Sequence, residues 1–417
     1  MVLFDKVLEF HPDGPWAVYE DFHEAIFSKW VFRAHDRNLR FDFHIPICDR
    51  TQSELKSVLA TFIAEEAKEI SLAGLTTPIL KSEGDKWKAF SAMQKAIRRG
   101  LFHEAWRSAH ALWAAGQGDA MWRRLVITSM EDIGLADPYA AAFTCWAAGN
   151  RKARVEIGEK QVLAFVLSAL CAAPKSRDLC DAVVYNFLPH TIEDEFAEAA
   201  KWEGDTLVEI AADLSRPMMQ RYLAHWRMFG PKFKCTSHDN PKADPLQSFV
   251  LYEKLKLPIL FQYIAYESYR KSGEALGIPV PFLWQYMTCS PWAKTAPDPF
   301  EDDKNEMCHG VLAATFDKHT WQGKGALKRF LAQCKPVREY LNKHCKGDHM
   351  AALERAVFYV EGALLRPRLF YEGAREFYFD VLTAKLISNG FPDFETGRAF
   401  YSLVQENLGL LNKLREK

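Results

Sequence analysis

Cysteine is never paired closely along this chain, although it occurs nine times in 417 residues. The sequence contains no C-x-x-C spacing, and the total number of cysteines is odd. Single, unpaired cysteines are typical of free thiols in a reducing compartment rather than of a disulfide framework. We therefore expect a cytoplasmic protein with free thiols.

The chain also lacks a strong charge of either sign and a long apolar run. It has 53 basic and 54 acidic residues, so no overall field favours nucleic acid or a membrane surface, and any such binding requires a local patch. The longest apolar run, Val162 to Ala173, is shorter than the ~20 residues that a membrane-spanning helix needs. The first ten residues, MVLFDKVLEF, have no basic leader region, so we expect no signal peptide and a soluble protein without membrane partners.

Motifs for nucleotide and hydrolase chemistry are missing as well. No G-x-x-x-x-G-K-S/T loop is present to wrap phosphates, and neither Gly116-Gln117-Gly118 nor Gly323-Lys324-Gly325 fits that pattern. The sequence has no G-x-G-x-x-G, H-E-x-x-H or G-x-S-x-G either. These observations nominate no catalytic residue and no cofactor.

Histidine and cysteine approach each other in three places, but with poor spacing for a metal. Tetrahedral zinc sites use four N or S ligands, commonly in two close pairs on turns. Here the candidates are adjacent or isolated, and we expect no metal site: Cys334, His344, Cys345 and His349; Cys308 and His309; Cys235 and His238.

The stretch from Asp119 to Pro138 carries the clearest structural signals. From Met121 to Asp132 it has no Gly or Pro, and apolar side chains recur at helical spacing, which predicts an amphipathic helix. Gly134 follows where a left-handed residue ends a helix, and Asp137-Pro138 supplies an N-cap and a proline at the first helical position. The stretch therefore predicts a helix, a tight corner and a second helix.

Helical periodicity continues along most of the chain, which predicts an all-α fold, a multi-helix array or bundle with a small mixed unit at its N-terminus. We expect three units, residues 1–80, 81–235 and 236–417. The first combines an alternating stretch, Leu39 to Cys48, that favours a strand with a helical stretch, Thr51 to Glu69. Turn-forming residues from Gly230 to Pro245 predict a linker, and Pro291 to Glu306 predicts an exposed loop that becomes acidic.

Two polar features leave alternatives open. Glu131 and Asp132 stand near a helix C-terminus, where the helix dipole disfavours carboxylates, so they either reach a basic neighbour on another helix or bind a partner. His319 and Thr320, followed by the Gly323-Lys324-Gly325 run, either bind an anion or form a cap and a turn.

A local excess of basic residues lies between Lys86 and Arg124, where eight Lys and Arg residues face two acidic residues. Phosphate contacts from Lys and Arg give sequence-independent affinity for nucleic acid, whereas many such clusters are simply solvated helical faces. Lys175 and Arg177 extend the cluster, which predicts a nucleic-acid-binding face whose candidate residues are Lys95, Arg98, Arg99, Arg123, Arg124, Lys175 and Arg177.

The same region resembles a known protein family. Arg123-Arg124-Leu125 leads to the string Glu131-Asp132-Ile133-Gly134-Leu135-Ala136-Asp137-Pro138, and an Ala-Ala-Pro-Lys-Ser turn follows at residues 172–176. Over residues 85 to 180 the sequence resembles the helical C-terminal region of clamp-loader-like AAA+ replication-associated recombination proteins. This family has bacterial members and includes the eukaryotic Werner-helicase-interacting ATPase.

The resemblance implies a collar-like helical domain that self-associates, with tetramers as the habit of the family, and work at replication forks or single-stranded DNA ends. It does not carry over ATPase activity, because only about 85 residues precede the match and the phosphate loop is missing. Our first hypothesis is therefore a non-catalytic, homo-oligomeric accessory protein of DNA replication or repair that binds single-stranded or forked DNA.

Two other hypotheses remain open. The chain could be a protein-interaction module that docks on, or inhibits, a clamp-loader-like AAA+ ATPase by mimicking its collar. It could instead be an enzyme with a site in the C-terminal half, around His319, Lys324 and the acidic loop.

Overall fold

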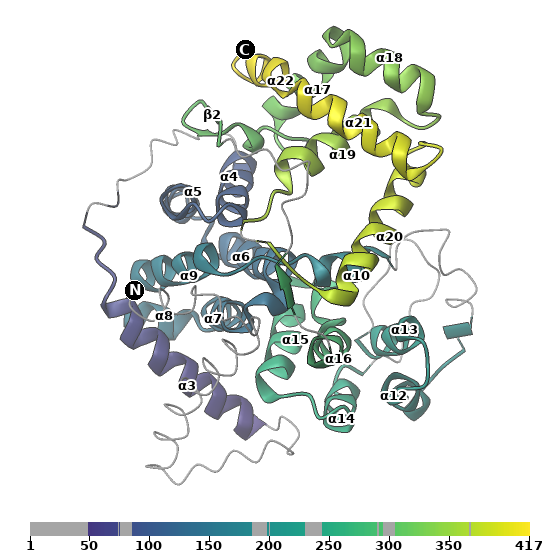
Figure 1. The fold of residues 1–417 in the computed structure, drawn as a ribbon. Coiled ribbons are helices and arrows are strands. Elements are labelled where there is room, and N and C mark those ends of the chain that lie inside the picture. The colour runs from purple at the N-terminus through teal and green to yellow at the C-terminus, as the bar shows by residue number, and fades with distance from the viewer. Residues whose placement is uncertain are drawn as a thin grey trace.

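A computed structural model describes residues 49–73, 75, 86–185, 198–199, 201–229, 244–289, 292–294, 305–366 and 368–417. The predicted all-α fold class is confirmed, because helices provide nearly all the regular structure of these residues (Figure 1). The strand predicted from Leu39 to Cys48 lies outside the described residues, as do most of the predicted linker and most of the acidic loop.

The first half of the chain contains a run of helices, most of them separated by short turns. Their bounds are α3 (Asp49–Lys68), α4 (Lys86–Arg98), α5 (Phe102–Ala114), α6 (Gly118–Asp132), η1 (Gly134–Ala136), α7 (Pro138–Gly149), α8 (Arg151–Ile157), α9 (Glu159–Ala172), α10 (Asp178–Tyr185), α12 (Asp205–Ala212) and α13 (Met218–Phe229).

The described residues of the second half form further helices and four very short strands. Their bounds are α14 (Gln247–Lys254), α15 (Ile259–Ser272), η2 (Ala275–Gly277), α16 (Val280–Cys289), β1 (Trp292–Lys294), β2 (Met307–Cys308), β3 (Val311–Leu312), η3 (Ala313–Thr315), α17 (Trp321–Gln333), α18 (Lys335–His344), α19 (His349–Val357), the π-helical turn η4 (Phe358–Gly362), β4 (Leu369–Tyr371), α20 (Glu372–Ser388), α21 (Phe394–Glu406) and α22 (Leu408–Arg415).

The corner predicted between Asp119 and Pro138 is confirmed in detail. Gly134 has φ +55°, a left-handed conformation that only glycine adopts at little cost, and one 3₁₀ turn fills the corner. A side-chain oxygen of Asp137 accepts a hydrogen bond from the Ala140 amide at 3.0 Å, and Pro138 occupies the first turn of α7. The chain therefore reverses within a few residues, which packs α6 against α7.

Helices α4 to α10 form the central body of the molecule. Helix α9 is buried almost throughout and contacts α3, α4, α5 and α7, as expected for the longest apolar run of the sequence. Helix α15 packs on α6 and α7, and α14 and α16 lie beside it (Figure 1). One apolar cluster runs from Leu55 to Leu414, so the described helices share a core.

The C-terminal helices form a lobe above this body. In Figure 1, α17, α18, α19, α21 and α22 gather at the top, and α20 descends from them to pack against α10. The lobe also contacts the body where η3 packs on α4. In addition, β4 pairs antiparallel with β1, with Trp292 opposite Tyr371. The division into three units stays a prediction.

Two stretches of the sequence with helical periodicity are each divided into two helices. The stretch from Leu246 to Tyr269 forms α14 and α15, and Pro258 directly precedes the first residue of α15. The stretch from Ala313 to Leu341 forms α17 and α18, and Pro336 lies in the first turn of α18. Proline lacks an amide hydrogen and clashes inside a helix, so each helix restarts there. Among the described residues, no helix combines the length and the apolar character needed to cross a membrane.

Candidate functional site

A buried carboxylate, Asp132, joins three segments of the central body. It is the last residue of α6 and is fully buried. Arg98 of α4 donates from Nε to Oδ2 at 2.8 Å, and Arg177, just before α10, donates from Nη2 to Oδ1 at 2.6 Å. Both guanidinium groups lie against the ring of Phe358 in η4, at 5.6 and 5.3 Å from its centre. Asp132 thus reaches basic neighbours on other segments, the first of the two alternatives for this carboxylate.

Glu131, the neighbouring carboxylate, lies at the edge of the same cluster. Its Oε2 accepts a hydrogen bond from Gln94 at 3.0 Å and is 3.8 Å from Nη2 of Arg98. Burial raises the pKa of Glu131 and the negative charge of Asp132 raises it further, while the arginines oppose both effects. The side chain stays half-exposed at this edge.

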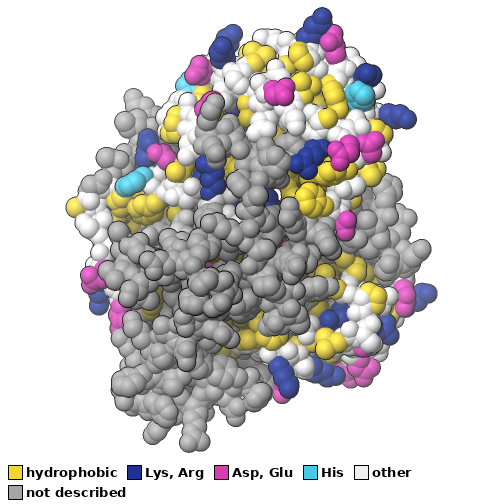
Figure 2. Space-filling view, in the orientation of Figure 1, with side chains coloured by type: hydrophobic (Ala, Val, Ile, Leu, Met, Phe, Trp, Pro, Cys, Tyr) yellow, Lys and Arg dark blue, Asp and Glu magenta, His cyan; other side chains and the backbone are white. Residues whose placement is uncertain are grey.

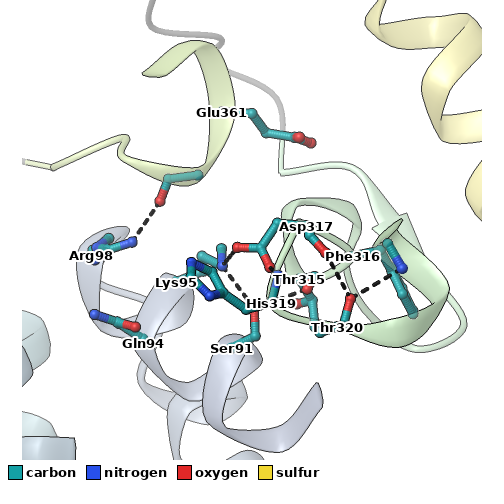
Figure 3. A network of polar contacts seen from close by, with 12 residues as sticks. Ser91, Gln94, Lys95, Arg98, Thr315, Phe316, Asp317, His319, Thr320 and Glu361 are labelled. Atoms are coloured by element: carbon teal, nitrogen blue, oxygen red, sulfur yellow. Dashed lines mark hydrogen bonds and ion pairs between the residues drawn. The ribbon is translucent and has the colours of Figure 1, made fainter. Parts of the chain in front are cut away.

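A second buried pair ties the C-terminal lobe to α4. The ammonium of Lys95 contacts a carboxylate oxygen of Asp317 and donates to Oγ of Ser91 at 2.7 Å, and Ser91 donates to the Thr315 carbonyl at 2.9 Å (Figure 3). Burial lowers the pKa of Lys95, and Asp317 opposes that effect. Burial raises the pKa of Asp317, but the Lys95 cation and hydrogen bond outweigh it, so this pKa stays below its ordinary value.

The π-helical turn η4 supplies a third set of contacts. Glu361 accepts hydrogen bonds from both terminal nitrogens of Arg415, at 2.9 and 2.8 Å, in a bidentate ion pair. Both side chains are buried. The carbonyls of η4 accept from α4 and its end: Gly362 from Arg98 Nη1 at 2.8 Å and Glu361 from Arg99 Nη2 at 3.0 Å. Residues more than 250 positions apart in sequence therefore meet at one surface of α4.

Lys175 is buried without a direct carboxylate partner among the described residues. It has no exposed surface, and its ammonium donates to the carbonyl of Cys171 at 3.1 Å and to that of Ala173. Burial lowers its pKa to about 8, since few groups here replace water around the charge. A backbone bridge between Lys175 and Arg368 adds a link to the chain leading into α20.

The predicted nucleic-acid-binding residues do not form one exposed face. Five of the seven are at most 7% exposed: Lys95, Arg98, Arg99, Lys175 and Arg177. Four of these cations are held by partners from distant parts of the chain, and Lys175 is held by carbonyls of its own turn, so a phosphate could reach them only if those contacts opened. Sequence reasoning missed Asp317, Glu361 and Arg415, because no local signal links them to α4. The odd placement of Asp132 was the one available hint.

The other two predicted residues, Arg123 and Arg124, remain at the surface. Arg123 is exposed, and its Nε donates to the Ser272 carbonyl at the end of α15, at 2.9 Å. Arg124 is half-exposed. Their contact with nucleic acid remains a prediction.

The remaining polar candidates have local structural roles. Thr320 caps α17 by accepting from the Gly323 amide at 3.1 Å, so the cap-and-turn alternative describes this segment. Within the described part of the chain, no three His, Cys, Asp or Glu side chains gather closely enough to hold a metal ion. Cys345 donates to the Asn389 carbonyl and His344 lies against Tyr340, while Cys235 and His238 lie outside the described residues.

Comparison with known protein families gives one match. Residues 109–187 match the family described as MgsA AAA+ ATPase C terminal. The resemblance predicted from the Glu131 to Pro138 string is thereby confirmed for this segment. The match contains Asp132, Lys175 and Arg177, while Arg98, Asp317 and Glu361 lie on either side of it. Comparisons with curated proteins and with solved structures find no match.

Proposed function

We propose that this chain is a non-catalytic, homo-oligomeric accessory protein of DNA replication or repair, built around a collar-like domain and able to bind DNA. The observation that carries the proposal is the match of residues 109–187 to the C-terminal domain of MgsA AAA+ ATPases. Its non-catalytic character rests on the sequence, which contains no phosphate loop.

The place of the matched segment supports a scaffold role. It extends from within α5 to α10 and supplies most of the central body on which α15 and the C-terminal lobe pack. A buried ion pair between Lys95 and Asp317 fixes the C-terminal lobe on α4, and such a pair loses much stability when one partner is removed. A body held in this way offers a stiff platform for assembly.

Binding to DNA is tested with the full chain and fluorescent single-stranded, forked and duplex oligonucleotides in a salt series. We expect binding that weakens steeply with salt, because cations that contact phosphates release counterions. Arg123→Glu with Arg124→Glu is expected to weaken binding without unfolding the protein. The charge-matched control is Lys68→Glu with Lys254→Glu, two exposed lysines at the ends of α3 and α14.

Self-association is tested by measuring the mass in solution with and without oligonucleotide. A mass of several chains, with a tetramer as the family habit, is expected. A monomer that binds no DNA at low salt would contradict the proposal. Co-purification of such a monomer with a clamp-loader-like AAA+ ATPase would instead support the docking alternative.

A further inference from the structure

The segment from Lys318 to Lys346 is strongly basic, although the chain as a whole is nearly neutral. It contains eight Lys and Arg residues and a single acidic residue, Glu339. It covers α17 and α18, at the top of the molecule in Figure 1, where Lys and Arg side chains stand along the upper rim in Figure 2. A local positive field of this size attracts anions, with a reach set by ionic strength.

An almost fully exposed tryptophan lies within this basic segment. Trp321 begins α17 and is 87% exposed, the largest value among the exposed large apolar side chains of the described residues. The opposite side of α17, with Ala326, Leu327 and Phe330, packs into the core, so α17 is anchored without its tryptophan. A large indole left in water does not stabilise the fold, and such side chains mark interaction sites.

Two free lysines share the face of Trp321. Lys324 and Lys328 follow at intervals of three and four residues, which places them on one side of the helix within about two turns. Both side chains are exposed, and among the described residues neither forms an ion pair. Other cations of the segment are engaged: Arg329 donates to the Leu414 carbonyl at 2.6 Å, and Lys335 is 3.6 Å from Glu339.

A further cation precedes this face. Lys318 is half-exposed just before α17. Desolvation lowers the pKa of His319, the negative charge of Asp317 opposes this shift, and the positive charges of Lys95, Lys318 and Arg124 lower the pKa further.

We propose that the α17 face, defined as Trp321, Lys324 and Lys328, binds single-stranded DNA by stacking a base on the indole while the lysines contact phosphates. The inference rests on the proposed function and names the surface that carries it. An aromatic ring stacks on any base whose face is free, and cations beside it track the backbone without reading sequence. Duplex DNA hides the faces of its bases, and an acidic peptide would engage the lysines but leave the indole without a flat partner.

The test uses fluorescence anisotropy of the full chain with labelled oligothymidylate. Trp321→Ala is expected to weaken binding about 5- to 150-fold, the effect of losing one stacked base, whereas Trp321→Phe, which keeps an aromatic face, retains most of the affinity. Lys324→Glu with Lys328→Glu is expected to weaken binding and to reduce the slope of log affinity against log salt by about 1.4, because two phosphate contacts on a single strand are lost.

The matched control is Arg151→Glu with Lys152→Glu, which makes the same charge change at two exposed residues that begin α8. Its affinity should fall much less than that of the α17 variant. An equal loss of DNA affinity in both double variants would show that only the overall charge of the protein matters, and it would overturn the proposed role of the α17 face.

Three further results overturn the inference. One is that Trp321→Ala binds DNA as tightly as the wild type, in which case the proposed function is kept but another surface binds the DNA. Another is an equal loss of polyglutamate and oligothymidylate binding in Trp321→Ala, which assigns the face to acidic peptides. A third is a change of oligomer mass in Trp321→Ala, which assigns the indole to a contact between copies. If the wild type binds no DNA at all, the DNA-binding part of the proposed function fails with it.

Discussion

At the scale of single residues, the main feature is that several Lys and Arg side chains are buried in the interior. Asp132 is shared by Arg98 and Arg177, Asp317 pairs with Lys95, and Glu361 holds Arg415. Removing charges from water costs several kcal/mol for each ion, and only close geometry with additional hydrogen bonds offsets that cost. Each carboxylate is therefore needed by cations that would otherwise be buried and unpaired.

Asp132→Asn is expected to lower the free energy of unfolding by ~3 kcal/mol, because two buried guanidinium groups lose the carboxylate that both of them contact. Chemical denaturation followed by circular dichroism measures the change. The control is Glu104→Gln, which removes a half-exposed pair with Arg107 and should cost at most ~1 kcal/mol. Similar losses in the two variants would contradict a structural role for the buried cluster.

A second residue-scale prediction concerns Asp178, whose pKa burial raises to about 7. Asp181 beside it raises this pKa further, while the hydrogen bond with Ser176 and the charge of Arg368 oppose the rise. Between about pH 4 and pH 7 the unfolded chain has released this proton and the folded protein retains it. Stability therefore falls as pH rises through this window, by up to ~1.4 kcal/mol per pH unit.

Asp178→Asn mimics the protonated carboxyl at every pH. We expect it to flatten the pH dependence of unfolding between pH 4 and pH 7, and to make the protein more stable than wild type at pH 8. Urea denaturation at pH 4, 6 and 8 checks this. Asp380→Asn, at an exposed position of α20, should leave the wild-type slope in place. An unchanged slope in Asp178→Asn would show that this carboxyl does not titrate as described.

At the scale of elements, the start of α17 depends on a close backbone approach. A Cβ on Gly323 would lie 2.1 Å from the carbonyl oxygen of Asp317, on a backbone that cannot move without disturbing the Lys95 pair. At Gly325, two residues later, the nearest obstacle is the flexible end of Arg329 at 3.3 Å. Two glycines of one helix thus have opposite roles.

Gly323→Ala is expected to destabilise the protein by at least ~2 kcal/mol through forced displacement of this turn. Gly325→Ala should be neutral, or stabilising by ~0.5–1 kcal/mol, because alanine is the better helix former. Thermal unfolding of the two variants side by side makes the comparison. A smaller loss for Gly323→Ala than for Gly325→Ala would mean that α17 does not begin in this close contact.

At the scale of the whole molecule, contacts between distant segments hold the lobe on the body. Arg415 on α22 reaches Glu361 in η4 and donates from Nε to the Phe316 carbonyl at 3.1 Å. The same η4 turn receives Arg98 and Arg99 from the central body. One apolar cluster also spans both parts, so lobe and body are expected to unfold together.

Arg415→Gln tests this coupling. It leaves Glu361 buried with the guanidinium partner gone, and we expect a loss of ~3 kcal/mol in a single transition that also unfolds α4. Hydrogen exchange of α4 amides, measured by mass spectrometry, reports on the body directly. Lys413→Gln, at an exposed position of the same helix, is the control and should change little. Faster exchange confined to α21 and α22 would show that the lobe opens independently.

Much of the local structure could be read from the sequence, because it depends on neighbours along the chain. The helix from Met121 to Asp132, the glycine corner and the Asp137 cap each follow from the conformational limits of one or two residues. The match to an AAA+ C-terminal domain was visible in the same string.

The fate of the basic residues was decided by tertiary structure alone. Lys95 meets Asp317 across 222 residues and Arg98 meets Gly362 across 264, and periodicity carries no information about such distant partners. A cation on an amphipathic helix looks the same in sequence whether water or a buried carboxylate receives it. The sequence by itself therefore determined local features such as the helix from Met121 to Asp132 and its glycine corner, whereas only tertiary packing, within the central body and between the C-terminal lobe and α4, decided which cations remain available to a ligand.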